Sequence, residues 1–188
     1  MDRWRILVVD DHTDTLELIR ITLVDDYDVL TLADPLDVCE TLQLFEPDLI
    51  ILDIMMPKVT GFQIMEIMQR DAAHRDIPII ILSAKDSTHE IKYGYKLGAK
   101  LYLTKPFQPE RLKKNVQILF EHPPPTRKPK QLTIRQVKTQ LQLKKTLRVG
   151  TPGGSTAMLH AMEEEKQARQ EKRKRPTPPP EEEQRWEG

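Results

Sequence analysis

The sequence predicts an α/β fold, a doubly wound parallel sheet of five strands with helices on both faces. Within residues 1–120, short runs of aliphatic and β-branched residues alternate with longer stretches whose apolar positions have helical spacing. The central runs are almost entirely apolar, as strands buried on both faces require. Regular strand–helix alternation of this kind is typical of a parallel sheet.

Five runs are predicted to be strands because they are short and rich in Val, Ile and Leu. They read RILVV (5–9), DVLTLA (28–33), LIILD (49–53), IIILS (79–83) and KLYLT (100–104). The stretches between them are long enough for the helices that connect parallel strands.

Helices are predicted from apolar residues that recur three or four positions apart. Pro35 and Pro109 fit the first turn of a helix. The apolar stripes are Leu16, Ile19, Leu23 and Val24; Leu36, Cys39, Leu42 and Leu44; Ile64, Ile67 and Met68; and Leu112, Val116 and Leu119. With one more helix in the connection between the fourth and fifth strands, we expect five strands alternating with five helices.

The composition indicates a soluble, cytoplasmic protein with no membrane partner. The chain has 188 residues and one cysteine, Cys39, so no intramolecular disulfide can form and a reducing compartment is expected. The apolar run near the N-terminus is too short for the core of a signal peptide. No apolar run approaches the roughly 20 residues that span a bilayer.

Charge divides the chain into an acidic and a basic part. Residues 1–120 hold 14 basic and 20 acidic side chains, a net charge of −6, whereas residues 121–188 hold 15 and 9, a net charge of +6. The boundary coincides with the proline-rich segment EHPPPTRKPK. We therefore predict one domain at 1–121, a proline-rich linker at 122–130 and a basic, low-complexity tail at 131–188.

The tail is predicted to be largely disordered, since residues 121–188 contain only eleven of V, I, L, M, F, W, Y and C. The apolar residues from Leu132 to Val149 fit neither a strand nor a helix period, whereas residues 155–175 could form a charged helix. No acidic residue occurs from His122 to Met162. Besides a solvated tail, a basic surface for a partner protein or for nucleic acid therefore remains open.

Polar residues follow the predicted strands at their carboxyl ends, namely Asp10, Asp11, Asp53, Ser83 and Lys105. Ligands bind at this edge of an open parallel sheet, so we expect these side chains to converge. Carboxylates about 4 Å apart repel by about 4 kcal/mol at a surface-like dielectric, and Mg²⁺ would remove that repulsion. With a lysine to attract an anion, such a site can hold a phosphoryl group.

Four segments resemble the motif blocks of the response-regulator receiver domain of two-component signal transduction. They read ILVVDDHTD, PDLIILDIMMPKVTGFQ, PIIILSAKD and GAKLYLTKPFQPERL, and they cover roughly residues 4–120 in the right order and spacing. The resemblance implies a flavodoxin-like strand order, 2-1-3-4-5. It also implies a phosphorylation-activated response regulator, which receives a phosphoryl group on Asp53 from a sensor histidine kinase or phosphotransfer protein.

The resemblance further implies how the acidic residues are used. Asp53 is the phosphoacceptor and nucleophile. Asp11 binds Mg²⁺ directly and Asp10 mainly through water, and the backbone carbonyl of Met55 completes the protein ligands together with Asp53.

The same resemblance assigns the remaining residues of the site. Lys105 pairs with the phosphoryl oxygens, and Ser83 turns inward to hydrogen-bond one of them. Tyr102 is the aromatic switch that moves inward with Ser83. The bond between Lys105 and Pro106 is expected to be cis.

Each of these residues alone has an ordinary alternative. Paired aspartates after a strand commonly cap a helix, Ser83 is a strand-end hydroxyl, and Lys105 is a solvated charge. Only their joint occurrence in register favours the phosphoryl site. The five histidines show no metal-ligand spacing, and we predict no role for them.

Two departures from the family pattern leave properties open. In the family, the side chains at the positions of Met55 and Lys85 border the path of the hydrolytic water, which leaves the dephosphorylation rate open. The segment GAKLYL lacks the acidic residues that winged-helix regulators usually carry after Gly-Ala, which leaves a homodimer open. We expect signalling by protein–protein contact, with DNA binding through the basic tail as the alternative. No catalysis beyond the protein's own phosphorylation and dephosphorylation is expected.

Overall fold

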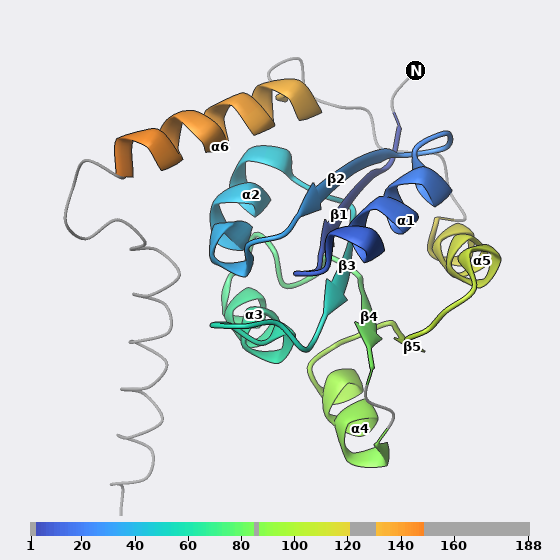
Figure 1. Ribbon diagram of the computed structural model, residues 1–188. Helices are drawn as coiled ribbons and strands as arrows, with labels where there is room; N and C mark the ends of the chain where they lie inside the picture. The colour runs from blue at the N-terminus through green and yellow to red at the C-terminus, as the bar shows by residue number, and fades with distance from the viewer. Residues whose placement is uncertain (1–2, 85–86, 121–130, 149–188) are drawn as a thin grey trace, which may run out of the picture.

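A five-stranded parallel sheet lies at the centre of the protein, in the order β2-β1-β3-β4-β5 (Figure 1). The computed structural model describes residues 3–84, 87–120 and 131–148. The strands are β1 (Arg5–Val9), β2 (Asp28–Leu32), β3 (Leu49–Asp53), β4 (Ile79–Ser83) and β5 (Leu101–Thr104). The predicted α/β class and the strand order implied by the resemblance are both confirmed.

Helices cover both faces of the sheet (Figure 1). α1 (Thr13–Leu23) and α5 (Pro109–Leu119) pack on one face, whereas α2 (Val38–Phe45) and α3 (Gly61–Arg70) pack on the other. α4 (Thr88–Lys96) contacts β5, and the short 3-10 helix η1 (Pro35–Asp37) precedes α2. In the described part of the chain, no helix is long and apolar enough to cross a membrane.

The predicted helical stripes are largely buried, with two differences. Val24 is exposed because α1 ends one residue before it, so its place in the first stripe was wrong. Leu36 lies in η1 rather than in α2, because Asp34 accepts a hydrogen bond from its backbone N–H and starts a separate turn.

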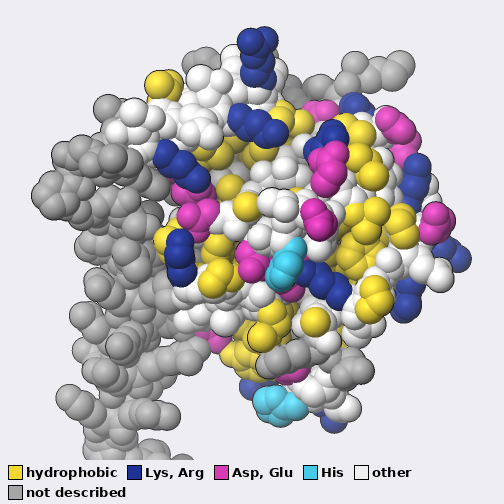
Figure 2. All heavy atoms as spheres, viewed as in Figure 1, with side chains coloured by type: hydrophobic (Ala, Val, Ile, Leu, Met, Phe, Trp, Pro, Cys, Tyr) yellow, Lys and Arg dark blue, Asp and Glu magenta, His cyan; other side chains and the backbone are white. Residues whose placement is uncertain are grey.

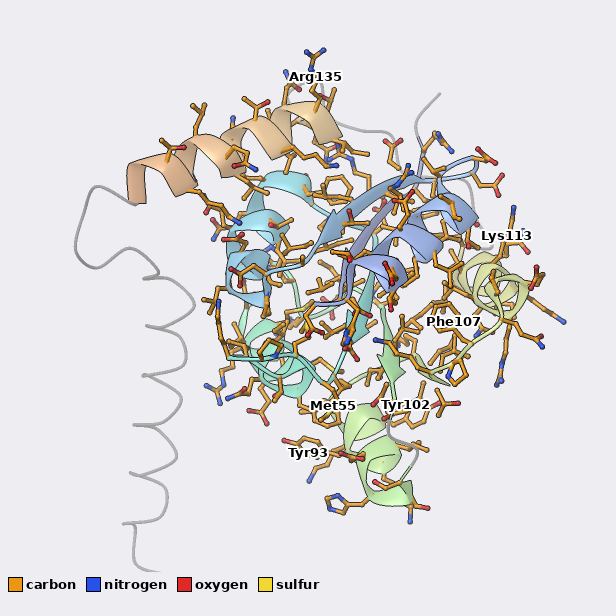
Figure 3. All side chains as sticks on the ribbon, in the orientation of Figure 1. Met55, Tyr93, Tyr102, Phe107, Lys113 and Arg135 are labelled. Atoms are coloured by element: carbon orange, nitrogen blue, oxygen red, sulfur yellow. The ribbon has the colours of Figure 1, made fainter. Side chains whose placement is uncertain are left out.

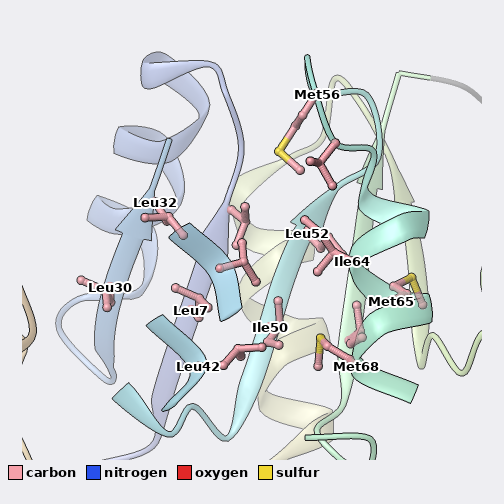
Figure 4. Close-up of a cluster of buried hydrophobic side chains, with 14 of the residues drawn as sticks. Leu7, Leu30, Leu32, Leu42, Ile50, Leu52, Met56, Ile64, Met65 and Met68 are labelled. Carbon is pink, nitrogen blue, oxygen red and sulfur yellow. The ribbon is translucent and has the colours of Figure 1, made fainter. Parts of the chain in front are cut away.

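The core consists of two apolar layers, one on each face of the sheet. Successive residues of β1 enter opposite layers: Leu7 and Val9 enter the layer beneath α2 and α3, and Ile6 and Val8 enter the layer beneath α1 and α5. Figure 4 shows part of the first layer, where side chains of β1, β2 and β3 meet those of α2 and α3. With both faces filled by apolar groups, the strand ends are the places left for polar chemistry.

A sixth helix, α6 (Ile134–Arg148), lies against α2, where the sequence predicted no regular structure (Figure 1). Val137 is fully buried and Leu141 is 8% exposed, and both join the apolar layer of α2. The prediction of a disordered tail was therefore wrong for these residues. A helix that has too few apolar residues for a core of its own is stabilised by packing on an existing one. The predicted helix at 155–175 and the linker at 122–130 lie outside the described residues.

Polar contacts hold the start of the tail to the sheet and to α2. The Arg5 guanidinium donates hydrogen bonds to the backbone oxygens of Phe45 (2.6 Å) and Leu132, and it stacks over the Phe45 ring. Further contacts are Lys144 with Glu40, Lys145 with Asp37 (2.5 Å) and Gln131 with Glu46. Basic side chains of the tail thus meet acidic side chains of η1 and α2, and Lys and Arg side chains gather over α6 in Figure 2.

Candidate functional site

The polar residues at the strand ends converge at the carboxyl edge of the sheet. Asp10 and Asp11 follow β1, and Asp53 is the last residue of β3. Asp10 is fully buried and Asp53 is 2% exposed. Each of these three carboxylates offers one oxygen to a cluster whose ligand atoms all lie within 4.8 Å of one another. The predicted convergence of these acids is therefore observed.

Lys105 neutralises part of this negative charge. Its Nζ lies 2.6 Å from Asp10 Oδ2 and 3.2 Å from Asp53 Oδ2, and its side chain is largely buried. Lys105 follows β5 directly, and its backbone N–H donates to the carbonyl of Ser83 (2.8 Å). One ammonium therefore bridges two buried carboxylates, which makes their burial tolerable.

The position of Asp53 alters its acidity. Burial raises the pKa of the Asp53 carboxyl above its ordinary value, the Lys105 ammonium lowers it, and the Asp10 carboxylate raises it again. The net direction is upward. Without further positive charge, the site thus favours the protonated form of Asp53 more than water does.

The donor set fits a hard divalent cation. Asp11 Oδ1 and Asp53 Oδ1 are buried, and neither has a hydrogen-bond partner among the described residues. Buried polar atoms are normally satisfied, so these two oxygens suit an added ligand. Mg²⁺ prefers oxygen ligands of this kind and keeps part of its hydration shell. Asp10 differs, since Lys105 and the backbone N–H of His12 (2.9 Å) already contact its oxygens.

The loop after Asp53 is held by a close backbone approach. The Gly61 N–H donates to the carbonyl of Ile54 (3.1 Å). A Cβ at Gly61 would lie 2.3 Å from the backbone oxygen of Asp53, so only glycine fits there. Thr60 and Gln63 form a capping box that starts α3 at this point. The loop carries Met55, whose side chain is exposed (Figure 3), and the role of its carbonyl stays a prediction.

Ser83 and Tyr102 lie on neighbouring strands. Ser83 is fully buried at the end of β4, where its register partner on β5 is Thr104. Tyr102, labelled in Figure 3, is half-buried two positions earlier on β5, beside Gly94 of α4. The peptide bond between Lys105 and Pro106 is cis, as the resemblance implied. The switch roles of Ser83 and Tyr102 stay predictions.

His12 belongs to the cluster although the sequence indicated no role for it. Its Nδ1 lies 3.0 Å from Asp11 Oδ1 and 3.4 Å from Asp10 Oδ1. Its position in the sequence could have indicated this, because His12 directly follows the aspartate pair and precedes α1.

Comparison with known proteins agrees with this geometry. The family model of the response regulator receiver domain matches residues 6–117. The chain belongs to this family. The receiver domain accounts for β1 through most of α5, and it leaves α6 outside the matched range.

Several relatives of this receiver domain are named as transcriptional regulators. The chain is 37% identical over 117 residues to the DNA-binding dual master transcriptional regulator RpaA of Synechocystis sp., and this match covers 62% of the chain and 48% of the relative. It is 34% identical over 117 residues to the alkaline phosphatase synthesis transcriptional regulatory protein PhoP of Bacillus subtilis, with the same coverage. The chain thus spans about half the length of these relatives.

Solved receiver domains share the fold. The chemotaxis protein CheY4 of Vibrio cholerae matches with a TM-score of 0.60 and 32% identity, which covers 63% of this chain and 100% of CheY4. The BeF3-activated receiver domain of DrrB matches with a TM-score of 0.59 and 26% identity, over 64% of this chain and all of that one. DrrB is a protein of Thermotoga maritima.

Proposed function

We propose that Asp53 accepts a phosphoryl group from the phosphohistidine of a sensor histidine kinase or a phosphotransfer protein. A carboxylate oxygen of Asp53 forms the bond to phosphorus while the P–N bond of the donor breaks and its imidazole leaves. The observation that carries this proposal is the position of Asp53. It is a buried carboxylate at the end of β3, 3.2 Å from the Lys105 ammonium and beside two further aspartates.

The residues that would hold Mg²⁺ are Asp11, Asp53 and the backbone carbonyl of Met55, with Asp10 acting mainly through water. The contacts of the two neighbouring aspartates support this division, because both oxygens of Asp10 have hydrogen-bond partners whereas Asp11 Oδ1 has no hydrogen bond among the described residues. When bound, Mg²⁺ supplies positive charge that offsets repulsion between the carboxylates and the phosphoryl oxygens. Together with Lys105 it favours the ionised form of Asp53, which is the nucleophile.

After transfer, Lys105 changes its partner. The ammonium now between Asp10 and Asp53 lies close enough to pair with a phosphoryl oxygen on Asp53. Ser83 then hydrogen-bonds a second phosphoryl oxygen, and Tyr102 turns inward beside it. This rearrangement at β4 and β5 passes the signal to the surface around α4.

Phosphorylation with a small-molecule donor tests the proposal. Purified protein is incubated with radiolabelled acetyl phosphate and Mg²⁺, and the label is counted after denaturation. Wild-type protein incorporates label, and Asp53→Asn does not. The matched control is Asp76→Asn, since Asp76 is an exposed aspartate that contacts only Arg75 among the described ion pairs. Labelling of Asp53→Asn at the wild-type level contradicts the proposal.

The output is proposed to be a contact with a partner protein, and DNA binding is the second candidate. Two observations support the second candidate, namely the DNA-binding relatives and the exposed basic residues Arg135 and Lys138 on α6 (Figure 3 labels Arg135). A salt-dependent mobility shift compares the full chain with the variant Arg135→Glu/Lys138→Glu. If the full chain binds DNA in a salt-sensitive way and the double variant does not, DNA is the favoured target. If both proteins shift the DNA equally, a protein partner is favoured.

We also propose a cytoplasmic location, which the single cysteine supports because it fits a reducing compartment. The only chemistry proposed for the chain is its own phosphorylation and dephosphorylation.

A further inference from the structure

His12 lies at the rim of the aspartate cluster. It directly follows Asp10 and Asp11 and is the first residue after β1 that is not an acid. Four side chains each offer one ligand atom, and these atoms all lie within 4.8 Å of one another: His12, Asp10, Asp11 and Asp53. The His12 ring is 68% exposed, so it can turn without disturbing the core. Its backbone is fixed, since its N–H donates to Asp10 Oδ1 (2.9 Å) and its carbonyl accepts a hydrogen bond from Leu16.

The contact between His12 and Asp11 is close without being a hydrogen bond. Nδ1 of His12 lies 3.0 Å from Asp11 Oδ1, and that oxygen has no hydrogen-bond partner among the described residues. Two donor atoms at right angles on one cation, each about 2.1 Å from it, lie about 3.0 Å apart. The spacing matches that of adjacent ligands on a single ion.

Asp53 supplies an independent indication of a ligand. It is 2% exposed, and its Oδ1 has no hydrogen-bond partner in the described part of the chain. A nearly fully buried carboxylate oxygen without a partner is costly, and a cation in the same cluster satisfies it. The imidazole of His12 and the Oδ1 atoms of Asp11 and Asp53, which make no hydrogen bond among the described residues, are therefore positioned to serve one ion.

We propose that His12 Nδ1 is an additional ligand at this site for a first-row divalent transition ion, such as Co²⁺ or Ni²⁺. The inference rests on the cation site of the proposed function and adds a nitrogen donor to it. Imidazole is a good ligand for these ions, whereas Mg²⁺ prefers oxygen and binds without it. The site thus discriminates between the two classes of cation through one side chain at its rim.

Calorimetric titration of the full chain with Co²⁺ and, separately, with Mg²⁺ tests this ligand. The variant His12→Phe keeps a ring of similar shape and removes both nitrogens. The matched control is His89→Phe, because His89 is an exposed histidine on α4. All titrations are made at about pH 8, where free histidine is neutral. Proton NMR of the Co²⁺ form reports the ligand directly, since a bound imidazole has strongly shifted ring signals.

We expect the ratio of Co²⁺ affinity to Mg²⁺ affinity to fall about tenfold or more in His12→Phe. Removing a side chain that only supports a metal ligand already lowers metal affinity by about tenfold or more. The shifted imidazole signals should disappear in the same variant, and His89→Phe should match the wild type. An unchanged affinity ratio, or shifted signals that persist, would overturn the proposal. Asp11→Ala separates this outcome from the proposed function: if it leaves Mg²⁺ affinity intact, the Mg²⁺ site itself is wrong.

Discussion

Lys105 stands between two buried carboxylates, and this contact shows how single residues set the chemistry of the site. Its ammonium is 2.6 Å from Asp10 and 3.2 Å from Asp53, yet the pKa of Asp53 is still raised because burial outweighs the lysine. Replacing a buried charged side chain by an uncharged one of similar volume is often neutral or stabilising. The cluster therefore holds Asp53 in an environment that costs stability and favours a bound cation.

Asp53→Asn should stabilise the metal-free protein. The folded-state pKa of Asp53 lies above its ordinary value, so the folded protein binds this proton more tightly than the unfolded chain does. As pH rises from about 4 through the raised pKa, ionised Asp53 therefore lowers the free energy of unfolding of the wild type. We expect the variant to be more stable near neutral pH, by about 1 kcal/mol.

Urea denaturation in EDTA at a series of pH values measures this difference. The stability gap between variant and wild type should widen with pH, and Mg²⁺ should narrow it by stabilising the wild type. A variant that is less stable than the wild type at neutral pH would mean that Lys105 outweighs the cost of burial.

Gly61→Ala should be much more damaging than Gly94→Ala. A Cβ at Gly61 meets backbone atoms, the oxygen of Asp53 at 2.3 Å and the Cα of Ile54 at 2.9 Å, so the loop of the site must move. A Cβ at Gly94 meets the flexible end of Ile81 at 2.6 Å, and alanine favours the helix by up to about 1 kcal/mol. We expect a loss of about 2 kcal/mol for Gly61→Ala and less than about 1 kcal/mol for Gly94→Ala. Thermal unfolding of the two variants compares them, and equal losses would contradict the close approach at Gly61.

Among the helices and strands, α6 lies outside the part of the chain that the receiver family matches. The strands were predictable because buried parallel strands are nearly all apolar, and the site aspartates were predictable because they lie at the carboxyl ends of such runs. α6 was not, because among its side chains that the structure describes, up to Thr146, only Val137 and Leu141 are buried and the others are partly or fully exposed. Two apolar residues four positions apart are a weak signal until the surface of α2 that receives them is known.

Leu141→Ala should destabilise the protein, whereas Leu143→Ala should not. Both lie on α6, but Leu141 is 8% exposed against α2 and Leu143 is 59% exposed. We expect a loss of about 2 kcal/mol for the first, the low end for buried leucines, and under about 0.5 kcal/mol for the second. Urea denaturation of the two variants measures both values. If Leu141→Ala behaves like Leu143→Ala, α6 is not docked in solution.

For the whole molecule, the division of charge has a structural consequence. In the basic tail, Lys144 and Lys145 of α6 pair with Glu40 of α2 and Asp37 of η1, so part of the excess charge of each half is met by the other. The sequence showed this asymmetry but not its geometry, since charge counts carry no information about which surfaces meet. The apolar contact at Val137 and Leu141 adds the part of the association that salt does not screen.

Amide hydrogen exchange of the full chain should therefore show protection in α6 that survives high salt. The Lys144–Glu40 and Lys145–Asp37 pairs join exposed ammonium groups to mostly buried carboxylates, so about 1 M NaCl should weaken the docking without abolishing it. The variant Leu141→Asp serves as the control, because it should remove protection from α6 and leave β1 and β3 protected. Exchange of α6 as fast as that of an unfolded peptide at low salt would contradict a docked helix.

The most direct test of the central claim locates the phosphoryl group on the chain. Protein treated with acetyl phosphate and Mg²⁺ is reduced with borohydride, which converts an aspartyl phosphate into homoserine, and its peptides are read by mass spectrometry. The predicted result is a single homoserine at position 53, absent when Mg²⁺ is replaced by EDTA. Homoserine at Asp10 or Asp11, or none at position 53 in labelled protein, would contradict the assignment of Asp53 as the phosphoacceptor.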